Sequence, residues 1–174
     1  MEYGGQIEKM RETFVSLGWI VILAVLLVFM VIAAEFESFI QTLIIMFTVP
    51  LAIIGVILAM IITGKTLSLP SGIGVVLLFG IIVNNAIVMV DYINQLRKKG
   101  VEKMEAIVQG AATRLRPVLM TASTTILGMI PMAISHAEGS ETRSLVAICI
   151  IGGLFMGTIL TLIVIPVLYS LFQK

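Results

Sequence analysis

The sequence predicts an all-α polytopic membrane protein, a bundle of five transmembrane helices with one further short helix on the cytoplasmic membrane surface. Of its 174 residues, 59% are apolar and only 12% are charged, about half the charged fraction of an average soluble domain. Asp, Glu, Lys and Arg are absent from five long windows, and a helix needs about 20 mostly apolar residues to cross a bilayer. Helices suit this environment because they satisfy their own backbone hydrogen bonds. The windows are 13–34, 38–64, 66–90, 117–137 and 144–173.

The first two spans are expected at about residues 14–34 and 40–62. The turnaround between them, 35–38, is too short to hold a domain. Residues 1–13 carry several charged side chains and are expected to form an extracytoplasmic segment ahead of the first span. Pro50 falls inside the second span, where it removes one backbone hydrogen bond and permits a bend.

The third span is expected at about 69–95, because Gly64 is a natural helix terminator and Pro70 suits a first helical turn. A basic run at 97–99, followed by Gly100, ends this span. Residues 101–112 then place apolar side chains at i, i+3, i+4 and i+7. This spacing predicts a short amphipathic helix lying flat on the membrane surface, with a solvated connector as the alternative.

The last two spans are expected at about 116–135 and 144–171, with Pro131 and Pro166 inside them. No linker of domain-boundary composition separates any of the spans. Residues 14–174 are therefore expected to form a single five-helix transmembrane domain.

Small residues in the last span favour close helix packing. Gly153 and Gly157 form a small-xxx-small pattern, which lets two helix backbones approach each other. The single cysteine, Cys149, lies in the same window and is expected to act as a small apolar packing residue.

The distribution of Lys and Arg predicts the orientation in the membrane. The face containing the 97–116 connection and the C-terminus carries seven of these residues, and the opposite face carries four. The more basic face is expected to be cytoplasmic, which places the N-terminus outside and the C-terminus inside. The seven are Arg97, Lys98, Lys99, Lys103, Arg114, Arg116 and Lys174, and the four are Lys9, Arg11, Lys65 and Arg143.

Four polar residues lie within or beside the spans, and the two amides among them are candidates for a polar relay or an ion path. Asn84 and Asn85 lie near the middle of the third span, where two amides are costly unless they bond to another helix. Interhelical packing is the alternative role for them. Arg114 and Thr121 are seven residues apart, two helical turns, and therefore share one helix face. For Arg114 the alternative is a side chain that reaches to the membrane interface.

Several classes of function are disfavoured by the sequence. It contains no Ser/His/Asp set, phosphate-binding loop or dinucleotide-binding glycine motif, and no His and Cys at metal-ligand spacing. A formal net charge of +1 gives no long-range attraction to nucleic acid. We therefore expect neither an enzyme nor a nucleic-acid-binding protein, and we expect no cofactor and no bound metal.

Several ordered motifs over about residues 14–172 resemble the resistance-nodulation-division (RND) efflux transporters, and most closely their hydrophobe/amphiphile efflux branch. The motifs are AAEFES at 33–38, TVPLAIIG at 48–55, GIIVNNAIVMVDYIN at 80–94, RLRPVLMT at 114–121 and IPMA at 130–133.

The resemblance implies that this chain corresponds to helices eight to twelve of a twelve-helix transporter. Such transporters are bacterial inner-membrane proteins that work as trimers and export drugs or other amphiphiles in exchange for protons. Their substrates enter through large extracytoplasmic domains. The implied partners of this chain are the missing N-terminal half, membrane lipid, further copies of itself, protons and an amphiphilic substrate.

The resemblance also assigns roles to the polar residues. Arg114 and Thr121 match the relay arginine and threonine of helix eleven, and Asn84 stands where well-studied members carry a lysine. The paired aspartates of the relay belong to the other half of such a transporter. An asparagine can donate a hydrogen bond to a carboxylate but cannot supply the counter-charge of a lysine. The chain is thus expected to be incomplete for transport. A free-standing scaffold or a lipid-responsive five-helix module is the alternative function.

Overall fold

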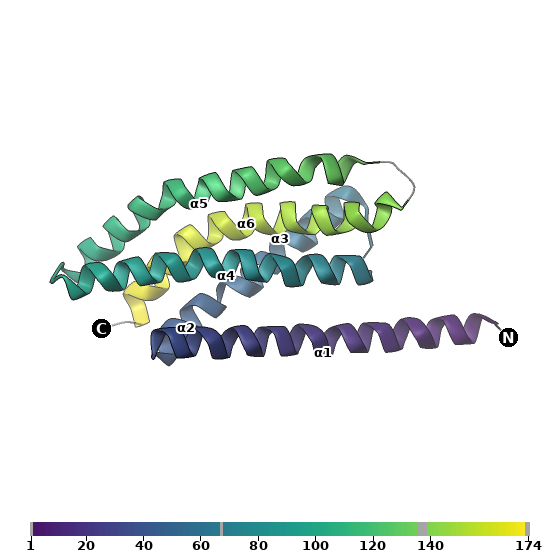
Figure 1. The fold of residues 1–174 in the computed structure, drawn as a ribbon, viewed down its shortest axis with the longest axis horizontal. Helices are drawn as coiled ribbons and strands as arrows, with labels where there is room; N and C mark the ends of the chain where they lie inside the picture. Colours follow the sequence, from purple (N-terminus) through teal and green to yellow (C-terminus); the bar gives the residue numbers. More distant parts are fainter. Residues whose placement is uncertain (1, 67, 136–138, 173–174) are drawn as a thin grey trace.

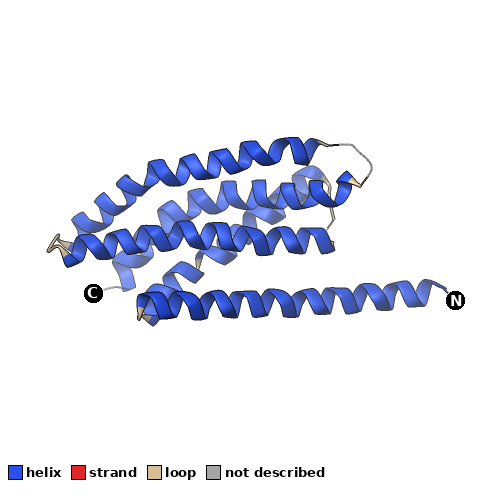
Figure 2. Ribbon diagram, viewed as in Figure 1, coloured by secondary structure: helices blue, strands red, loops and turns tan. Residues whose placement is uncertain are grey.

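The computed structural model describes residues 2–66, 68–135 and 139–172. Within these residues the ordered elements are all helices, and no strand is present (Figure 2). The helices are α1 (Glu2–Phe36), α2 (Phe39–Met46), α3 (Thr48–Thr63), α4 (Leu69–Lys98), α5 (Lys103–Ile134) and α6 (Ser140–Phe172).

Five helical stretches are long and apolar enough to cross a membrane, which confirms the predicted fold class. They are Gly18–Phe36, Phe39–Thr63, Leu69–Lys98, Lys103–Ile134 and Ser140–Phe172. The turn signals between them are also confirmed. Gly64 ends α3 in the left-handed conformation with φ 64°, and Pro70 lies in the first turn of α4.

The first helix begins much earlier than its predicted span of 14–34. α1 runs without interruption from Glu2, so most of the expected N-terminal segment 1–13 is helical; Met1 lies outside the described residues. No proline interrupts this stretch, so the helix can propagate beyond the apolar window. A charge-free window therefore predicts which part of a helix can lie in the bilayer, but it does not predict where the helix begins or ends.

The predicted span 40–62 is divided into two helices at Phe47, and Pro50 lies in the first turn of α3 instead of inside a continuous helix. Proline lacks the N–H that would bond to the carbonyl four residues earlier, here that of Met46. The hydroxyl of Thr48 donates to the carbonyl of Ile45 at 2.7 Å. The proline therefore falls where a missing donor costs least.

The separate surface helix predicted for 101–112 is not present, because these residues form the start of α5, which continues through Pro117 to Ile134. One side of this segment packs inward through Ala106, Ile107 and Gly110, which are all buried, while its apolar residues Met104 and Val108 are 62% and 64% exposed. A Cβ on Gly110 would lie 2.5 Å from Ile93 Cγ1 of α4. Burial against α4 thus replaces contact with the membrane surface, and Figure 1 shows α5 curving along the edge of the bundle.

Helix α6 lies at the centre of the bundle, packed against α3, α4 and α5, while α1 and α5 occupy opposite edges (Figure 1). Helices α4 and α6 run parallel. Gly153 faces Leu78, and Gly157 faces Ile82 one turn further along. α1 is the least enclosed span, with 6% of its most apolar window buried against 44% for α4 and α6.

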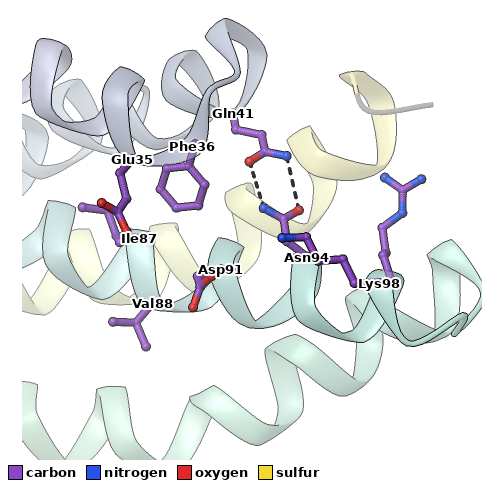
Figure 3. Close-up of a pocket in the computed structure, with 9 residues that line it drawn as sticks. Glu35, Phe36, Gln41, Ile87, Val88, Asp91, Asn94 and Lys98 are labelled. Carbon is purple, nitrogen blue, oxygen red and sulfur yellow. Dashed lines mark hydrogen bonds between the residues drawn. The ribbon is translucent and has the colours of Figure 1, made fainter.

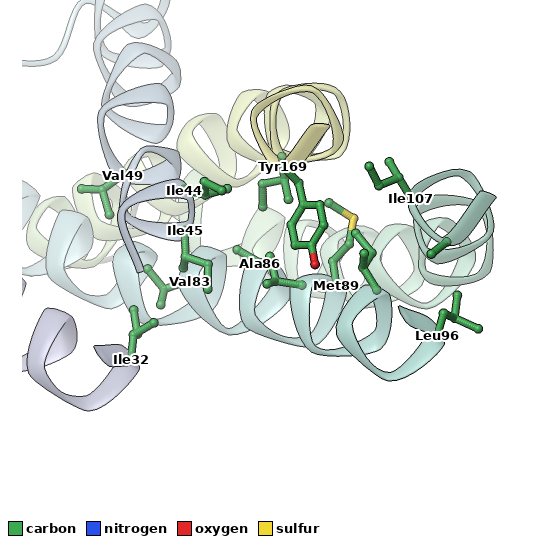
Figure 4. Close-up of a cluster of buried hydrophobic side chains, with 14 of the residues drawn as sticks. Ile32, Ile44, Ile45, Val49, Val83, Ala86, Met89, Leu96, Ile107 and Tyr169 are labelled. Carbon is green, nitrogen blue, oxygen red and sulfur yellow. The ribbon is translucent and has the colours of Figure 1, made fainter. Parts of the chain in front are cut away.

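The larger core cluster lies toward the end of the bundle where α1 and α4 end and α6 finishes. Figure 4 shows Tyr169 of α6 among side chains of α2, α4 and α5, including Met89 and Ile107. Tyr169 and Met89 are both almost inaccessible to solvent. The same end of the bundle carries most of the hydrogen-bonded polar side chains described below.

Candidate functional site

The two asparagines in the middle of α4 differ in exposure. Asn84 is exposed and Asn85 is half-buried. Neither amide forms a hydrogen bond to another described residue in this structure. Ala86 beside them is fully buried, so the polar pair lies at the border between the bundle core and an open face of α4.

Arg114 of α5 is half-buried against α4. Its guanidinium lies over the ring of Tyr92, with Cζ 4.8 Å from the ring centroid. The Nε atom is buried and has no hydrogen-bond partner among the described residues. The cation is therefore held at one face by an aromatic ring and keeps an unsatisfied donor, a costly state inside a membrane protein unless another group bonds to it.

Thr121 of α5 is exposed, and its hydroxyl donates to the carbonyl of Val118 at 3.0 Å. The contact between Arg114 and Tyr92 gives a common level on the two helices. Thr121 lies seven residues after Arg114 on α5, and Asn85 lies seven residues before Tyr92 on α4. Because α4 and α5 run in opposite directions, Thr121 and Asn85 lie at about the same level, two turns from the cation–π contact. Arg114, Thr121 and Asn85 thus lie along one interhelical seam of α4 and α5, although no hydrogen bond joins them, and Asn84 lies beside Asn85 on the exposed side of α4.

The open face of α4 carries further polar groups. Asp91 lies two turns after Asn84 and is also exposed. Its Oδ2 accepts a hydrogen bond from Gln95 Nε2 at 2.8 Å. Asn84, Asp91 and Thr121 therefore face outward from spans whose other exposed side chains are mostly apolar.

A second polar cluster connects three helices near the C-terminal end of α4, and the sequence reasoning missed it. Gln41 of α2 and Asn94 of α4 form reciprocal amide hydrogen bonds, Gln41 Nε2 to Asn94 Oδ1 at 3.2 Å and Asn94 Nδ2 to Gln41 Oε1 at 2.8 Å (Figure 3). The hydroxyl of Tyr169 donates to the same Asn94 Oδ1 at 2.6 Å. Gln41 and Tyr169 are polar residues inside charge-free windows, and this feature could have marked them as candidate site residues. The sequence does not show that both bond to Asn94.

A cavity of about 490 Å³ lies beside this cluster, between the end of α1, the start of α2 and the last turns of α4. Figure 3 shows Glu35 of α1 and Asp91 of α4 on the same side of the Gln41–Asn94 pair. The polar lining residues are Glu35, Gln41, Asp91, Asn94, Arg97 and Lys98.

Gly153 and Gly157 both lie in close interhelical contact. A Cβ on Gly157 would lie 2.5 Å from Ile82 Cδ1, and a Cβ on Gly153 would overlap Leu78. Gly152 of α6 and Gly55 of α3 bring the backbones of these two helices together. A Cβ on Gly55 would lie 2.5 Å from the carbonyl oxygen of Gly152. The small residues therefore set the approach of α6 to both α3 and α4.

No group of three or more His, Cys, Asp or Glu side chains positioned to hold a metal ion occurs within 2–66, 68–135 and 139–172.

The fold and the polar seam together define a polytopic membrane protein with ionisable and amide groups between its helices. The chain belongs to the AcrB/AcrD/AcrF family of RND transporters, whose pattern it matches over residues 1–173.

Several relatives cover the whole chain. The swarming motility protein SwrC of Bacillus subtilis is 34% identical over 175 residues, and the cobalt-zinc-cadmium resistance protein CzcA of Cupriavidus metallidurans is 40% identical over 174 residues. The crystal structure of a heavy metal efflux pump, crystal form II, is similar with a TM-score of 0.87 and 38% identity over 97% of this chain. This chain spans only 17% of the length of SwrC, 16% of CzcA and 17% of that pump.

Proposed function

We propose that this chain is the C-terminal membrane part of a proton-driven RND efflux transporter and is incomplete for transport by itself. Family membership over residues 1–173 supports this function, as does the small share of its relatives' length that the chain covers. In the whole transporter it would lie in the bacterial inner membrane, with the start of α1 outside and the end of α6 in the cytoplasm. The beginning of α1 and the end of α6 lie at opposite ends of the bundle, as five crossings require (Figure 1).

The observation that carries the proposal is the polar seam of α4 and α5. Asn84 and Thr121 are exposed at membrane depth, and the buried Nε of Arg114 has no hydrogen-bond partner in the described structure. Polar groups facing hydrocarbon are costly, so such a face requires a partner. We assign the missing N-terminal half as this partner, its carboxylates bonding to Arg114 and Asn84. Three such complete subunits would assemble as a trimer.

The seam would couple proton movement to export. A carboxylate of the other half would bind a proton more readily when it is desolvated, and it would release the proton when it pairs with Arg114. Asn84 would donate a hydrogen bond to the ionised carboxylate without neutralising it. The charge change therefore would depend mainly on Arg114, with Thr121 as a hydroxyl on the same face.

For the substrate we propose drugs or other amphiphiles, as the resemblance to the hydrophobe/amphiphile branch implies. Divalent heavy-metal cations are the second candidate, because the 40% identical CzcA is named for cobalt, zinc and cadmium resistance. The extracytoplasmic domains that would select the substrate lie outside this chain.

The test uses the complete transporter in cells without their own exporters of this type. We expect efflux of a fluorescent amphiphile that stops when the proton gradient is collapsed, and that is lost in Arg114→Ala. Arg116→Ala is the matched control, because Arg116 is exposed two residues away. A zinc- and cobalt-accumulation assay in the same cells decides between the two substrates. A complete transporter that moves neither, or an Arg114→Ala variant as active as wild type, would contradict the proposal.

A further inference from the structure

Three polar side chains without hydrogen-bond partners lie inside the bundle, on α4 and α6. The residues Thr158 and Thr161 of α6 are only 4% and 3% exposed, and neither hydroxyl bonds to a described residue. The amide of Asn85 in α4 is half-buried and also has no partner in the described part of the chain. A buried hydroxyl or amide without a hydrogen bond is costly, so these side chains require a partner that supplies donors and acceptors.

The contacts along α4 determine which way Asn85 faces. Leu78, Asn85 and Tyr92 follow one another at intervals of seven residues, about two helical turns, and so share one face of α4. Leu78 lies against Gly153 of α6, and Tyr92 lies under the guanidinium of Arg114 in α5. Asn85 lies between these two contacts and therefore faces the groove where α5 and α6 meet on α4.

The contacts along α6 place the two threonines in the same way. Thr158 shares a face of α6 with Tyr169, about three turns later, whose hydroxyl donates to a side chain of α4 at 2.6 Å. Ser144, about four turns before Thr158, donates to a backbone carbonyl of α5 at 2.8 Å. Thr158 therefore faces the junction of α4 and α5, and Thr161 follows it on the buried side of α6.

The three side chains also lie at one level of the bundle. α4 and α6 run parallel, and three contacts between them join residues 75 positions apart: Leu78 with Gly153, Ile82 with Gly157 and Asn94 with Tyr169. By the same offset, Asn85 is level with Leu160, between Thr158 and Thr161. At about 1.5 Å of rise per residue, both threonines lie within about 3 Å of Asn85 along the helix axis.

We infer that the junction of α4, α5 and α6 is a binding site for internal water, held by the Asn85 amide and the hydroxyls of Thr158 and Thr161. A buried water makes about three hydrogen bonds, as many as there are unpaired side chains here. All three groups are uncharged and both donate and accept, which suits water better than a cation. Water can reach them from the polar seam, where Asn85 is half-buried.

This assignment gives the two neighbouring asparagines different roles. Asn85 would be joined through water to α6, the central helix of the bundle, while the exposed Asn84 is left to face the other half of the transporter. The water site requires only this fold and not transport, so it can fail or hold independently of the proposed function.

Cryo-electron microscopy of the purified complete transporter, at a resolution that resolves ordered water, tests the site directly. We expect water density within hydrogen-bond distance of the Asn85 amide and of the Oγ1 atoms of Thr158 and Thr161. A map that resolves water elsewhere between the helices but none here, or that has both hydroxyls bonded to carbonyls of α6 itself, would overturn the inference.

A double-mutant cycle gives an independent test in solution. Thr158→Val removes the hydroxyl with little change of shape, and Asn85→Leu removes the amide. If water joins the two groups, their effects on the unfolding equilibrium in bicelles are coupled, and we expect the double variant to differ from the product of the single effects by about three- to tenfold.

Thr42→Val is the matched control for this cycle. The hydroxyl of Thr42 is also buried, but it donates to the carbonyl of Ser38 at 3.0 Å and lies on α2, so its effect is expected to be independent of Asn85→Leu. Independent effects for Thr158→Val and Asn85→Leu would contradict a water bridge. Stabilisation that appears in sodium but not in choline buffer, and is lost in Thr158→Val, would assign the site to a cation instead and overturn the inference.

Discussion

The guanidinium of Arg114 lies over the aromatic ring of Tyr92, 4.8 Å from its centroid, and this contact joins α5 to α4 at the polar seam. The ring covers one face of the cation, while the buried Nε has no partner among the described residues. Tyr92 therefore positions Arg114 toward the open side of the seam, where the proposed carboxylates of the other half would lie.

Replacing Tyr92 tests this positioning. Tyr92→Phe keeps the aromatic face and is expected to transport like wild type, whereas Tyr92→Leu removes a cation–π contact of about 0.5–2 kcal/mol. We expect Tyr92→Leu to lower proton-coupled efflux severalfold and to shift its pH dependence. Efflux measured across a pH series gives the answer, with thermal unfolding as a check on folding. Equal profiles for the two variants would show that the ring does not position Arg114.

The side-chain amide of Asn94 in α4 accepts and donates the hydrogen bonds that join this helix to α2 and α6. Asn94→Leu would leave the amide of Gln41 and the hydroxyl of Tyr169 without their partners, a loss of about 1–3 kcal/mol for each buried group. Tyr169→Phe is expected to cost less, because Gln41 still bonds to Asn94. Unfolding of the purified protein in bicelles measures both, with the exposed Gln95→Ala as control. The prediction is wrong if Asn94→Leu unfolds at the same denaturant concentration as Gln95→Ala.

The glycines between helices predict a graded series. Gly55→Ala would press its Cβ against the backbone carbonyl of Gly152, which cannot rotate away, and is expected to destabilise the protein by about 1–3 kcal/mol. The Cβ of Gly157→Ala would come too close to the terminal methyl of Ile82, which can shift, and would lie at ordinary contact distance from Ala52, so this variant is expected to cost less. Gly128→Ala has open space and is expected to be neutral or stabilising by about 0.5–1 kcal/mol. Thermal unfolding of the three variants checks this order, and a different ranking would contradict it.

The predicted orientation is tested by labelling single cysteines in intact cells, in a Cys149→Ala background. A cysteine at Lys65 is expected to react with a membrane-impermeant maleimide added outside, because the connection after α3 would be extracytoplasmic. A cysteine at Lys99 is expected to react only after the cells are permeabilised. Both positions are exposed in the structure, so a difference in labelling reports the side of the membrane. The reverse pattern would invert the orientation.

The five spans and their turn residues follow from local sequence alone. The apolar windows, Gly64 and Pro70 act within a few residues of chain, because helix formation in hydrocarbon and the conformational needs of a turn are local effects. The similarity of the 80–94 and 114–121 motifs to RND transporters is likewise readable from the chain, and it is enough to mark Asn84, Arg114 and Thr121 as relay candidates.

Tertiary structure decided which side of each helix is buried. When all faces of a span are apolar, hydrophobic periodicity does not distinguish the lipid-facing side from the packed side. The sequence thus did not reveal that 101–112 packs against α4, that Tyr92 covers Arg114, or that Gln41, Asn94 and Tyr169 meet. These contacts join residues 17 to 75 positions apart, and only the docking of α4 against α2, α5 and α6 brings them together.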